Sequence, residues 1–249
     1  MGPTELRVRF AAELWFLLPP RHRHPEAHLR YDGTSSLGHV IESNGVPLPE
    51  VGRLEVNATP VAASHRPAAG DLVTVLGVPR PQKVPFSPLK FLLDVHLGAL
   101  ARRLRLVGVD AAYHNDRDDP ALVEQANAEE RVLLTQDRRL LHRRNLRAGG
   151  YVRGSDPDRQ LHDVLERFAP PLAPWSRCTA CNGTLAPVHK DEVKDLLEPG
   201  TRATYDTFAQ CQACGRLYWP GAHHRRLTAI VAAAEETVAA AATPEPRQA

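Results

Sequence analysis

The chain has 249 residues, which is long enough for two domains with a small third unit attached. Its formal net charge of +2 is close to neutral and favours no class of partner. No apolar stretch approaches the length of a membrane span, since the apolar run from Phe10 to Leu18 is broken by Glu13. This run also lacks a basic leader and a small-residue cleavage site, so we expect a cytoplasmic protein without a membrane partner.

The first part of the chain reads as a strand-rich sheet crossed by one helix. The helix has a serine cap and is ended by Asn44 and Gly45. We predict a domain over residues 1–78 and a stiff proline-rich linker over 79–88. The predicted strands cover 6–10, 53–57 and 71–76, and the predicted helix covers 35–43.

The next part, residues 89–172, alternates short apolar strands with helices. The first of these helices ends before Gly108, a natural C-cap. Such alternation predicts an α/β fold with a parallel sheet and helices on both faces. The predicted strands are 91–93, 111–113, 132–135 and 151–152; the predicted helices are 97–107, 120–129, a basic stretch of 138–147, and 158–168.

Acidic residues follow every strand of this predicted sheet. Asp94 follows the first strand, Asp119 lies beyond the second, and Asp137 follows the third. Ligands bind at the carboxyl ends of the strands in open α/β sheets. Converging carboxylates there are the ligands that Mg²⁺ or Mn²⁺ requires, and such ions polarise a phosphodiester and activate a water. The remaining acids considered for this edge are Asp116, Asp118, Asp156 and Glu124.

Each acid also has a purely structural interpretation. Asp119 and Asp156 precede prolines and have the form of helix N-caps, and Asp137 also precedes a helix. Asp94 has the weakest structural explanation, because an acid that ends an apolar strand needs a solvated cleft or a partner. Asp116 and Asp118 are typical of loop acids, and Glu124 of a solvated helix face.

Two arginine-rich segments flank these acids. They are typical either of solvated helix faces or, beside a carboxylate cleft, of a track for the phosphate backbone. His96 lies close to Asp94 and either contacts substrate or fills a surface position. The basic residues of the first segment are Arg102, Arg103 and Arg105, placed on its polar side; those of the second are Arg138, Arg139, His142, Arg143, Arg144 and Arg147.

The four cysteines of the chain form two C-x-x-C pairs, Cys178 with Cys181 and Cys211 with Cys214. Two such turns complete a tetrahedral four-sulfur shell around Zn²⁺. Asn182-Gly183 and Gly215 follow the pairs and give the chain the positive-φ freedom of a tight turn. Disulfides or a redox dithiol are the alternative, which an oxidising compartment would favour. With four thiolates the zinc has no open position, so we expect it to be structural, and His223 and His224 are not needed as ligands.

From Leu89 to about Ile230, the chain resembles the Mut-seven C-terminal RNase family. The segments that carry the resemblance are Leu89–Asp110, Arg131–Arg138, Gln160-Leu161, Arg177–Gly183 and Cys211–His223. The resemblance implies a PIN-like nuclease domain over 89–172 with a zinc ribbon over 173–230. It also implies metal-ion ribonuclease chemistry with Asp94 and Asp137 as the core acids and Asp119 as a further acid.

The N-terminal block is similar to the ubiquitin-like β-grasp domain that precedes this nuclease module, related to the sulfur carriers ThiS and MoaD. Residues 8–14, 41–47, 56–57 and 70–75 carry this match. A sulfur carrier ends in a free Gly-Gly, whereas here the last strand continues through Gly77 into the linker. We therefore expect a docking unit with a protein partner. The tail, residues 231–249, is predicted to be helical or disordered, with disorder from Ala239 onward.

These patterns predict a divalent-metal ribonuclease, a hydrolase whose arginines hold the RNA. The predicted RNA-binding residues are Arg102, Arg103, Arg138, Arg139 and Arg143. The alternative is a non-catalytic RNA-binding or adaptor module, in which the acids are caps and the zinc ribbon and arginines supply the affinity.

Overall fold

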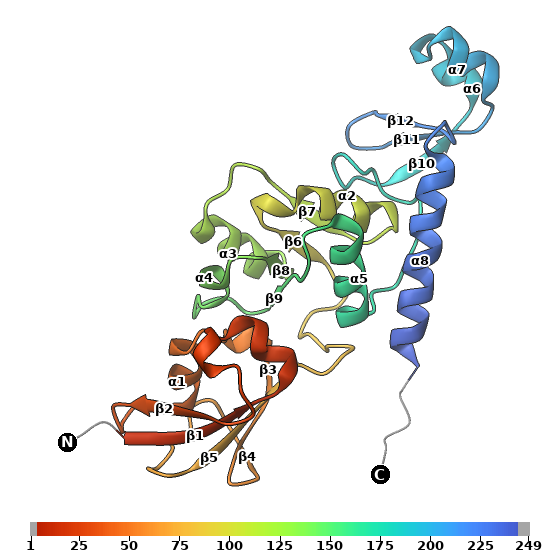
Figure 1. The fold of residues 1–249 in the computed structure, drawn as a ribbon. Coiled ribbons are helices and arrows are strands. Elements are labelled where there is room, and N and C mark those ends of the chain that lie inside the picture. The colour runs from red at the N-terminus through yellow and green to blue at the C-terminus, as the bar shows by residue number, and fades with distance from the viewer. Residues whose placement is uncertain (1–3, 244–249) are drawn as a thin grey trace. The chain divides into compact units, whose positions relative to one another are not determined.

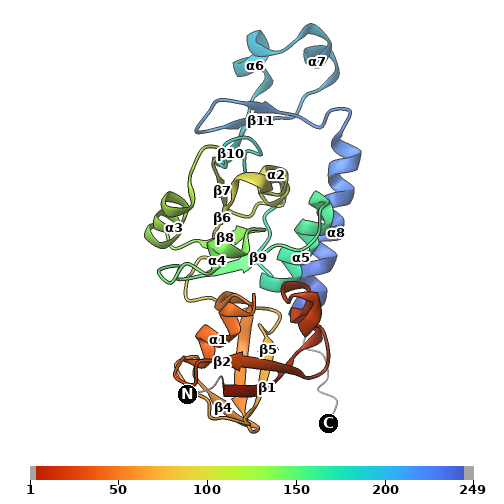
Figure 2. The ribbon, with the colours of Figure 1, turned by 60° about the vertical axis from the view of Figure 1, so that its left-hand side comes forward.

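The computed structural model describes residues 4–243 and divides into two compact units. One unit joins Met1–Pro79 with Thr135–Tyr151, and the other joins Arg80–Leu134 with Val152–Ala249. Figure 1 gives the element labels, and Figure 2 shows the same ribbon after a turn of 60°. No helix in the described part of the chain is both long and apolar enough to cross a membrane.

A five-stranded sheet with the order β2-β1-β5-β3-β4 forms the base of the first unit. Strands β1 and β5 pair in parallel, and the other neighbours pair antiparallel. The alternation predicted for β1 is confirmed, because Leu6, Val8 and Phe10 are buried while the residues between them are exposed. The elements of this part are β1 (Thr4–Phe10), β2 (Ala27–Tyr31), α1 (Leu37–Ser43), β3 (Val51–Val56), β4 (Thr59–Val61), β5 (Leu72–Gly77) and the 3₁₀ turns Ala12–Leu17, Pro20–His22 and Leu48–Glu50.

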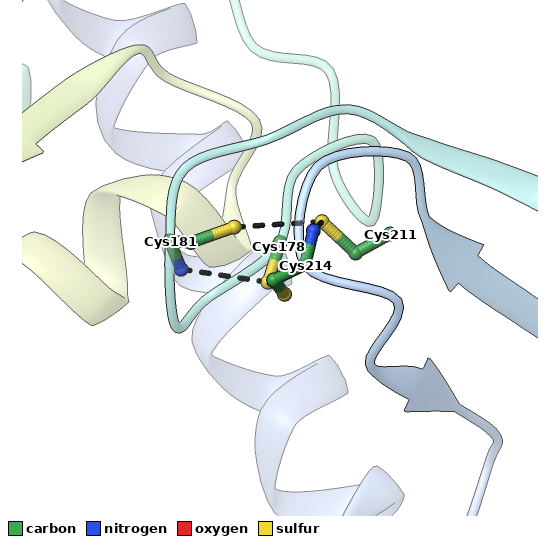
Figure 3. A group of neighbouring side chains, drawn as sticks. All are labelled: Cys178, Cys181, Cys211 and Cys214. Atoms are coloured by element: carbon green, nitrogen blue, oxygen red, sulfur yellow. Dashed lines mark hydrogen bonds between the residues drawn. The ribbon is translucent and has the colours of Figure 1, made fainter.

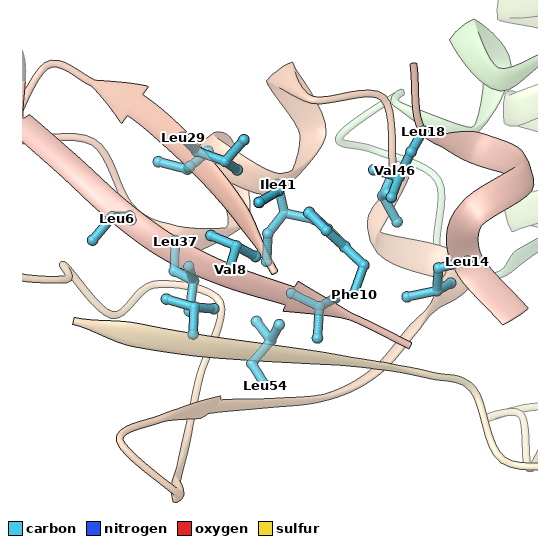
Figure 4. Packing of buried hydrophobic residues seen from close by; sticks show 14 of the residues in the cluster. Leu6, Val8, Phe10, Leu14, Leu18, Leu29, Leu37, Ile41, Val46 and Leu54 are labelled. Atoms are coloured by element: carbon cyan, nitrogen blue, oxygen red, sulfur yellow. The ribbon is translucent and has the colours of Figure 1, made fainter. Parts of the chain in front are cut away.

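The core of this unit lies between the sheet and α1, as Figure 4 shows. Helix α1 buries Leu37 and Ile41 in that core. The predicted serine cap is confirmed, since the Ser36 hydroxyl accepts a hydrogen bond from the His39 amide at 3.4 Å. The helix ends at Ser43, and Gly45 has a φ of 96°. The local signals therefore placed both ends of α1 correctly.

Residues 135–151 pack against the N-terminal sheet domain, in the same compact unit. The Tyr151 amide donates to Glu50 Oε1 at 2.8 Å, and Glu50 is only 2% exposed. The rings of Phe16 and Tyr151 lie 5.4 Å apart, and Arg138 donates to the Leu17 carbonyl oxygen at 2.7 Å. A segment that the sequence assigned to the nuclease domain is therefore also part of the N-terminal core.

The basic helix expected over 138–147 is much shorter in the structure. Helix α4 covers Arg138–Leu141, and the chain then turns before β9 (Gly149–Tyr151). Arg139, Arg143 and Arg147 would stand one turn apart on a continuous helix, where like charges repel. Such repulsion, about 0.2–0.5 kcal/mol per pair, disfavours a continuous helix over these residues.

The second unit contains most of the predicted parallel sheet. Strand β6 (Phe91–Leu93) pairs in parallel with β7 (Ala111–Tyr113) and β8 (Val132–Thr135), and the strand order is β7-β6-β8-β9. All three residues of β6 are fully buried, as expected for a central parallel strand. The helices are α2 (Gly98–Leu106), α3 (Asp119–Ala128) and α5 (Pro157–Phe168), with a 3₁₀ turn at Val95–Leu97.

The proline-rich segment predicted as a linker is packed against α5. Arg80 forms ion pairs with Asp163 at 2.9 Å and Glu166 at 2.6 Å. The Gln82 amide donates to the Arg167 carbonyl oxygen at 2.6 Å, and Arg167 Nε donates to Gln82 Oε1 at 2.7 Å. The start of the segment is thus held by side-chain contacts that no local proline signal encodes. The domain boundaries themselves stay predictions.

The cysteine-containing module is a three-stranded sheet with a helical insertion. Strand β10 (Leu185–Val188) pairs antiparallel with β11 (Phe208–Cys211), which pairs with β12 (Leu217–Tyr218). The insertion between β10 and β11 buries Val193 and Leu197 in a small core together with Phe208, the first residue of β11. It consists of α6 (Lys190–Val193), a 3₁₀ turn (Lys194–Leu196) and α7 (Pro199–Thr204).

The chain continues in α8 (His224–Ala242), which packs along α5 in both views. The disorder predicted from Ala239 onward is wrong as far as Ala242, because alanine has the highest helix propensity and extends α8 to that point. The rest of that predicted disorder, residues 244–249, lies outside the described residues.

Candidate metal centre and acidic residues

The four cysteines converge on one point, as Figure 3 shows. Their sulfur atoms all lie within 4.8 Å of one another. Cys178 Sγ is 3.7 Å from Cys214 Sγ, and Cys181 Sγ is 3.4 Å from Cys211 Sγ. These separations are too long for disulfide bonds of about 2 Å. They approach the spacing of about 3.8 Å that four 2.3 Å bonds to a tetrahedral ion require. The thiols therefore fit a four-sulfur metal site.

The two C-x-x-C turns have the same backbone design. In each turn the second cysteine amide donates to the first cysteine's sulfur at 3.5 Å. The residue after each turn has a φ of 71°, Asn182 in one and Gly215 in the other. The positive φ expected at Asn182-Gly183 thus falls on the asparagine. Gly183 is required for another reason, because a Cβ there would meet the Ala213 side chain at 2.7 Å and Cys211 Sγ at 2.9 Å.

The thiols differ in their proton affinity. Burial tends to raise the pKa of Cys178, but hydrogen bonds from the Tyr218 hydroxyl and the Cys181 amide outweigh it and lower the pKa to about 6. The Tyr218 oxygen lies 3.0 Å from Cys178 Sγ. Burial, reinforced by the neighbouring sulfur atoms, raises the pKa of Cys181 to about 12. Neighbouring thiolates repel one another, and a cation relieves this repulsion as the thiols lose their protons.

The first cysteine turn is fastened to the parallel-sheet domain by a buried arginine. Arg105 is 4% exposed and donates to the carbonyl oxygens of Thr179 at 3.2 Å and Ala180 at 2.8 Å. Its Nε donates to the Ala111 carbonyl oxygen at the start of β7 at 2.8 Å. The prediction that Arg105 lies on the polar side of its helix is therefore wrong. Its guanidinium instead satisfies carbonyl groups that the turn leaves unpaired.

Asp110 is the second link between the sheet and the cysteine turn. Its carboxylate accepts hydrogen bonds from Arg131 at 2.6 Å and from the Asn182 amide group at 2.8 Å, and Arg177 approaches it at 3.2 Å. The Ala111 amide donates back to Asn182 Oδ1 at 3.1 Å. Burial tends to raise the pKa of Asp110, but these hydrogen bonds outweigh it and lower the pKa below its ordinary value. Sequence reasoning missed Asp110 because its partners, Arg131, Arg177 and Asn182, lie 21 or more positions away along the chain.

Asp94 occupies the position that its sequence context predicted. It follows β6 directly and is 7% exposed. Its carboxylate accepts from the Val95 amide at 2.6 Å and caps a short 3₁₀ turn. The Asp94 amide donates to the Leu134 carbonyl oxygen at 3.0 Å, because β6 and β8 pair with Leu93 opposite Leu134. The backbone of Asp94 is thus held by the neighbouring strand, and its buried carboxylate by the Val95 amide.

The structure revises the capping role expected for Asp119. The N-cap of α3 is Asp118, whose carboxylate accepts from the Ala121 amide at 3.0 Å, and Asp119 is the first residue of the helix. Pro120 fits the second position equally well, since both first-turn positions lack an amide partner. The half-buried Asp119 therefore does not serve as the cap. Asp116 and Glu124 are exposed.

Asp137 and Asp156 are both helix caps. Asp137 is exposed and accepts from the Arg139 amide at 2.8 Å, so its capping interpretation is confirmed. Asp156 accepts from the amides of Asp158 at 2.9 Å and Arg159 at 3.1 Å. A cap does not exclude metal binding, because an ionised carboxylate has further lone pairs. Among residues 4–243, the cysteines are the one group of three or more potential metal-ligating side chains with atoms within 4.8 Å, so the catalytic role of these acids stays a prediction.

The arginines predicted to contact RNA differ in their environments. Arg103 is engaged with Asp158 at 2.6 Å, and Arg138 with the Leu17 carbonyl oxygen. Arg102, Arg139 and Arg143 are exposed. His96 is also exposed. Their role in RNA binding remains a prediction.

Two family models match the chain in sequential order. Residues 89–231 match the Mut7-C RNAse domain, and residues 4–83 match the Mut7-C ubiquitin domain. The first match covers more than half of the 249 residues. No curated protein and no solved structure matches the chain.

Proposed function

The chain belongs to the Mut7-C RNase domain family, and we propose that it is a divalent-metal-dependent ribonuclease that hydrolyses RNA phosphodiester bonds. The family match over residues 89–231 carries this proposal. The buried carboxylate of Asp94, at the carboxyl end of a central parallel strand, supports it, because ligands bind at this edge of open α/β sheets.

In this proposal Asp94, Asp137 and Asp119 hold Mg²⁺ or Mn²⁺. Carboxylate oxygens are the donors that these hard cations prefer, so the residue types fit. When bound, such an ion polarises the phosphoryl group and lowers the pKa of a water molecule. The chain contributes the fixed position of Asp94, which its hydrogen bond with Val95 maintains.

The predicted arginines would position the RNA backbone through its phosphates. Two further proposals complete this function. The four cysteines hold a structural zinc, since their spacing fits a tetrahedral ion. The N-terminal domain docks a protein partner in the cytoplasm, since its last strand continues into the packed segment at Arg80 and has no free end for sulfur transfer.

One observation favours a non-catalytic RNA-binding module as the second candidate. Asp94 and Asp137 each accept a hydrogen bond from a helix-initiating amide, which gives both residues a structural role. In that case, their carboxylates would be needed for folding and not for cleavage.

Replacing Asp94 or Asp137 with asparagine separates the two candidates. Asparagine caps helices as well as aspartate, so the stability of Asp137→Asn should change by less than about 1 kcal/mol. If the carboxylates hold the metal, cleavage of labelled single-stranded RNA in Mg²⁺ or Mn²⁺ should fall by at least about 100-fold, typical of losing one charge-stabilising group.

Asp156→Asn is the matched control. Asp156 caps α5 in the way that Asp137 caps α4, and the substitution is chemically identical. We expect this variant to cleave RNA at the wild-type rate. An Asp137→Asn protein that also cleaves at the wild-type rate would refute the assignment, and absence of cleavage by the wild-type chain on any RNA would favour the binding module.

A further inference from the structure

Two of the three tryptophans in the chain are exposed, and both belong to the cysteine-containing part. Trp175 is 39% exposed and Trp219 is 41% exposed. Burying an indole fully would stabilise the fold, and the exposed part of each of these large apolar side chains forgoes that gain. Neither the metal site nor the acidic residues use these side chains. They therefore need a different explanation.

A continuous series of contacts connects the two indoles. The Trp219 indole lies over Gly221, where an added Cβ would meet its Nε1 at 3.1 Å. The Gly221 carbonyl oxygen accepts from the His224 amide at 2.9 Å, and the centroid of the His224 ring lies 5.1 Å from that of Trp175, with the rings tilted by 37°. The two tryptophans thus belong to one surface, organised by the turn that precedes α8.

The backbone holds Trp175 in a conformation that large side chains rarely adopt. Its φ is 64°, which is an outlier for a bulky residue. Its amide donates to the Leu106 carbonyl oxygen at 3.1 Å, which fixes the turn to the end of α2. Strained residues of this kind concentrate at functional positions.

The first turn of α8, which begins at His224, carries positive charge that the described part of the fold does not neutralise. His223, His224, Arg225 and Arg226 are consecutive and exposed. Within residues 4–243, neither Arg225 nor Arg226 makes a side-chain hydrogen bond or ion pair. Arg225 and Arg226 stand in the first turn of α8, which contains no acidic residue. Cations there are disfavoured by the helix dipole, so helix stability does not account for them.

We propose that Trp175, Trp219, Arg225 and Arg226 form a binding surface for single-stranded RNA. Base stacking on exposed aromatic rings, next to unpaired cations that contact phosphates, is the means by which proteins hold single strands without reading their sequence. A protein partner would have to supply acidic side chains to these cations, whereas every nucleotide of RNA supplies both a base and a phosphate. The inference deepens the proposed function, because it names the surface that holds the substrate, and it does not depend on catalysis.

The test is a binding titration of the full-length, zinc-loaded chain in buffer without added Mg²⁺ or Mn²⁺. The probe is a fluorescein-labelled oligouridylate of about 20 nucleotides, long enough for one such site and free of secondary structure. Replacing either indole with leucine should raise Kd by about 5- to 150-fold, the range for losing one stacked base. Trp219→Phe should retain most of the affinity, because a smaller aromatic ring still stacks.

The paired substitution Arg225→Ala/Arg226→Ala should lower the slope of log Kd against log salt concentration by about 1.4, or about 0.7 for each phosphate contact. Arg21→Ala/Arg30→Ala, which removes two exposed arginines of the N-terminal domain, is the matched control and should leave the slope unchanged. In a Trp15→Phe background, the emission that remains comes from Trp175 and Trp219, and RNA should quench it.

Binding by the Trp219→Leu and paired arginine variants within twofold of wild type, or emission that RNA leaves unquenched, would overturn the inference. More than half of each indole is covered, and the Trp219 ring lies 6.3 Å from the Phe208 ring, so circular dichroism checks that every variant is folded before its binding is compared. RNA binding with the expected losses in a chain that never cleaves would support the surface and refute the proposed nuclease. Metal-dependent cleavage with unchanged binding in these variants would refute the surface alone.

Discussion

Substituting Asp110 with asparagine tests how much this carboxylate, the second link beside Arg105, contributes to holding the cysteine turn against the parallel-sheet domain. The change keeps the size of the side chain and removes the charge that Arg131, Arg177 and Asn182 share. A hydrogen bond to a charged group contributes about 1.5–3 kcal/mol. Arg131 still reaches Glu129 and the Phe91 carbonyl oxygen, so we expect a total loss of about 2–3 kcal/mol. For a chain of this size, that corresponds to a fall in Tm of about 4–12 °C.

Asp158→Asn is the control for this experiment, because it also removes one carboxylate from an ion pair, that with Arg103 at 2.6 Å. Asp158 is 48% exposed, so solvent screens the pair and the loss should be about 0.5 kcal/mol. Thermal and urea unfolding of the two variants, with zinc present, measures the difference. A loss in Asp110→Asn no larger than that in Asp158→Asn would refute the reasoning.

The dependence on pH provides a second readout. The folded state lowers the pKa of Asp110, so its stabilisation is complete above the ordinary aspartate pKa of about 3.9 and is lost as the pH falls through the lowered value. The stability difference between wild type and Asp110→Asn should therefore stay constant from about pH 8 to pH 5. A difference that varies within this range would show that another group is responsible.

Two further predictions concern the cysteines and the N-terminal domain. Freshly purified, reduced protein should contain close to one zinc per chain by elemental analysis. The Cys178→Ser variant should lose this zinc and its ribbon should unfold, whereas Ser176→Ala should keep both. Wild-type protein without zinc would contradict the prediction. Deleting residues 1–79 should leave the Arg80–Leu134 sheet and the cysteine module folded but speed amide exchange in Thr135–Tyr151, because Glu50, Phe16 and Leu17 contact that segment. Unchanged exchange in 135–151 would show that these contacts do not stabilise it.

Local sequence signals were sufficient for several elements of this fold and for the cysteine site. Strands such as Leu6–Phe10 and Phe91–Leu93 follow from the alternation or continuity of apolar residues. The ends of α1 follow from Ser36 and Gly45, because capping and positive φ depend on neighbouring residues. Two C-x-x-C pairs specify a four-sulfur cluster, since the spacing itself places each pair of thiols on one turn.

The tertiary structure decided the features whose partners are distant along the chain. Arg105 is buried because it donates to carbonyl oxygens of Thr179 and Ala180. The hydrogen bonds of Asp110 include one from the Asn182 side chain. These partners lie about 70 positions away along the chain. Contacts between distant residues also pack Thr135–Tyr151 against Phe16 and Glu50. The ion pair of Arg80 with Asp163 in α5 is a further contact of this kind. Periodicity and caps report only the interactions of neighbouring residues, whereas a long-range hydrogen bond forms only after the chain has folded and brought its two groups together.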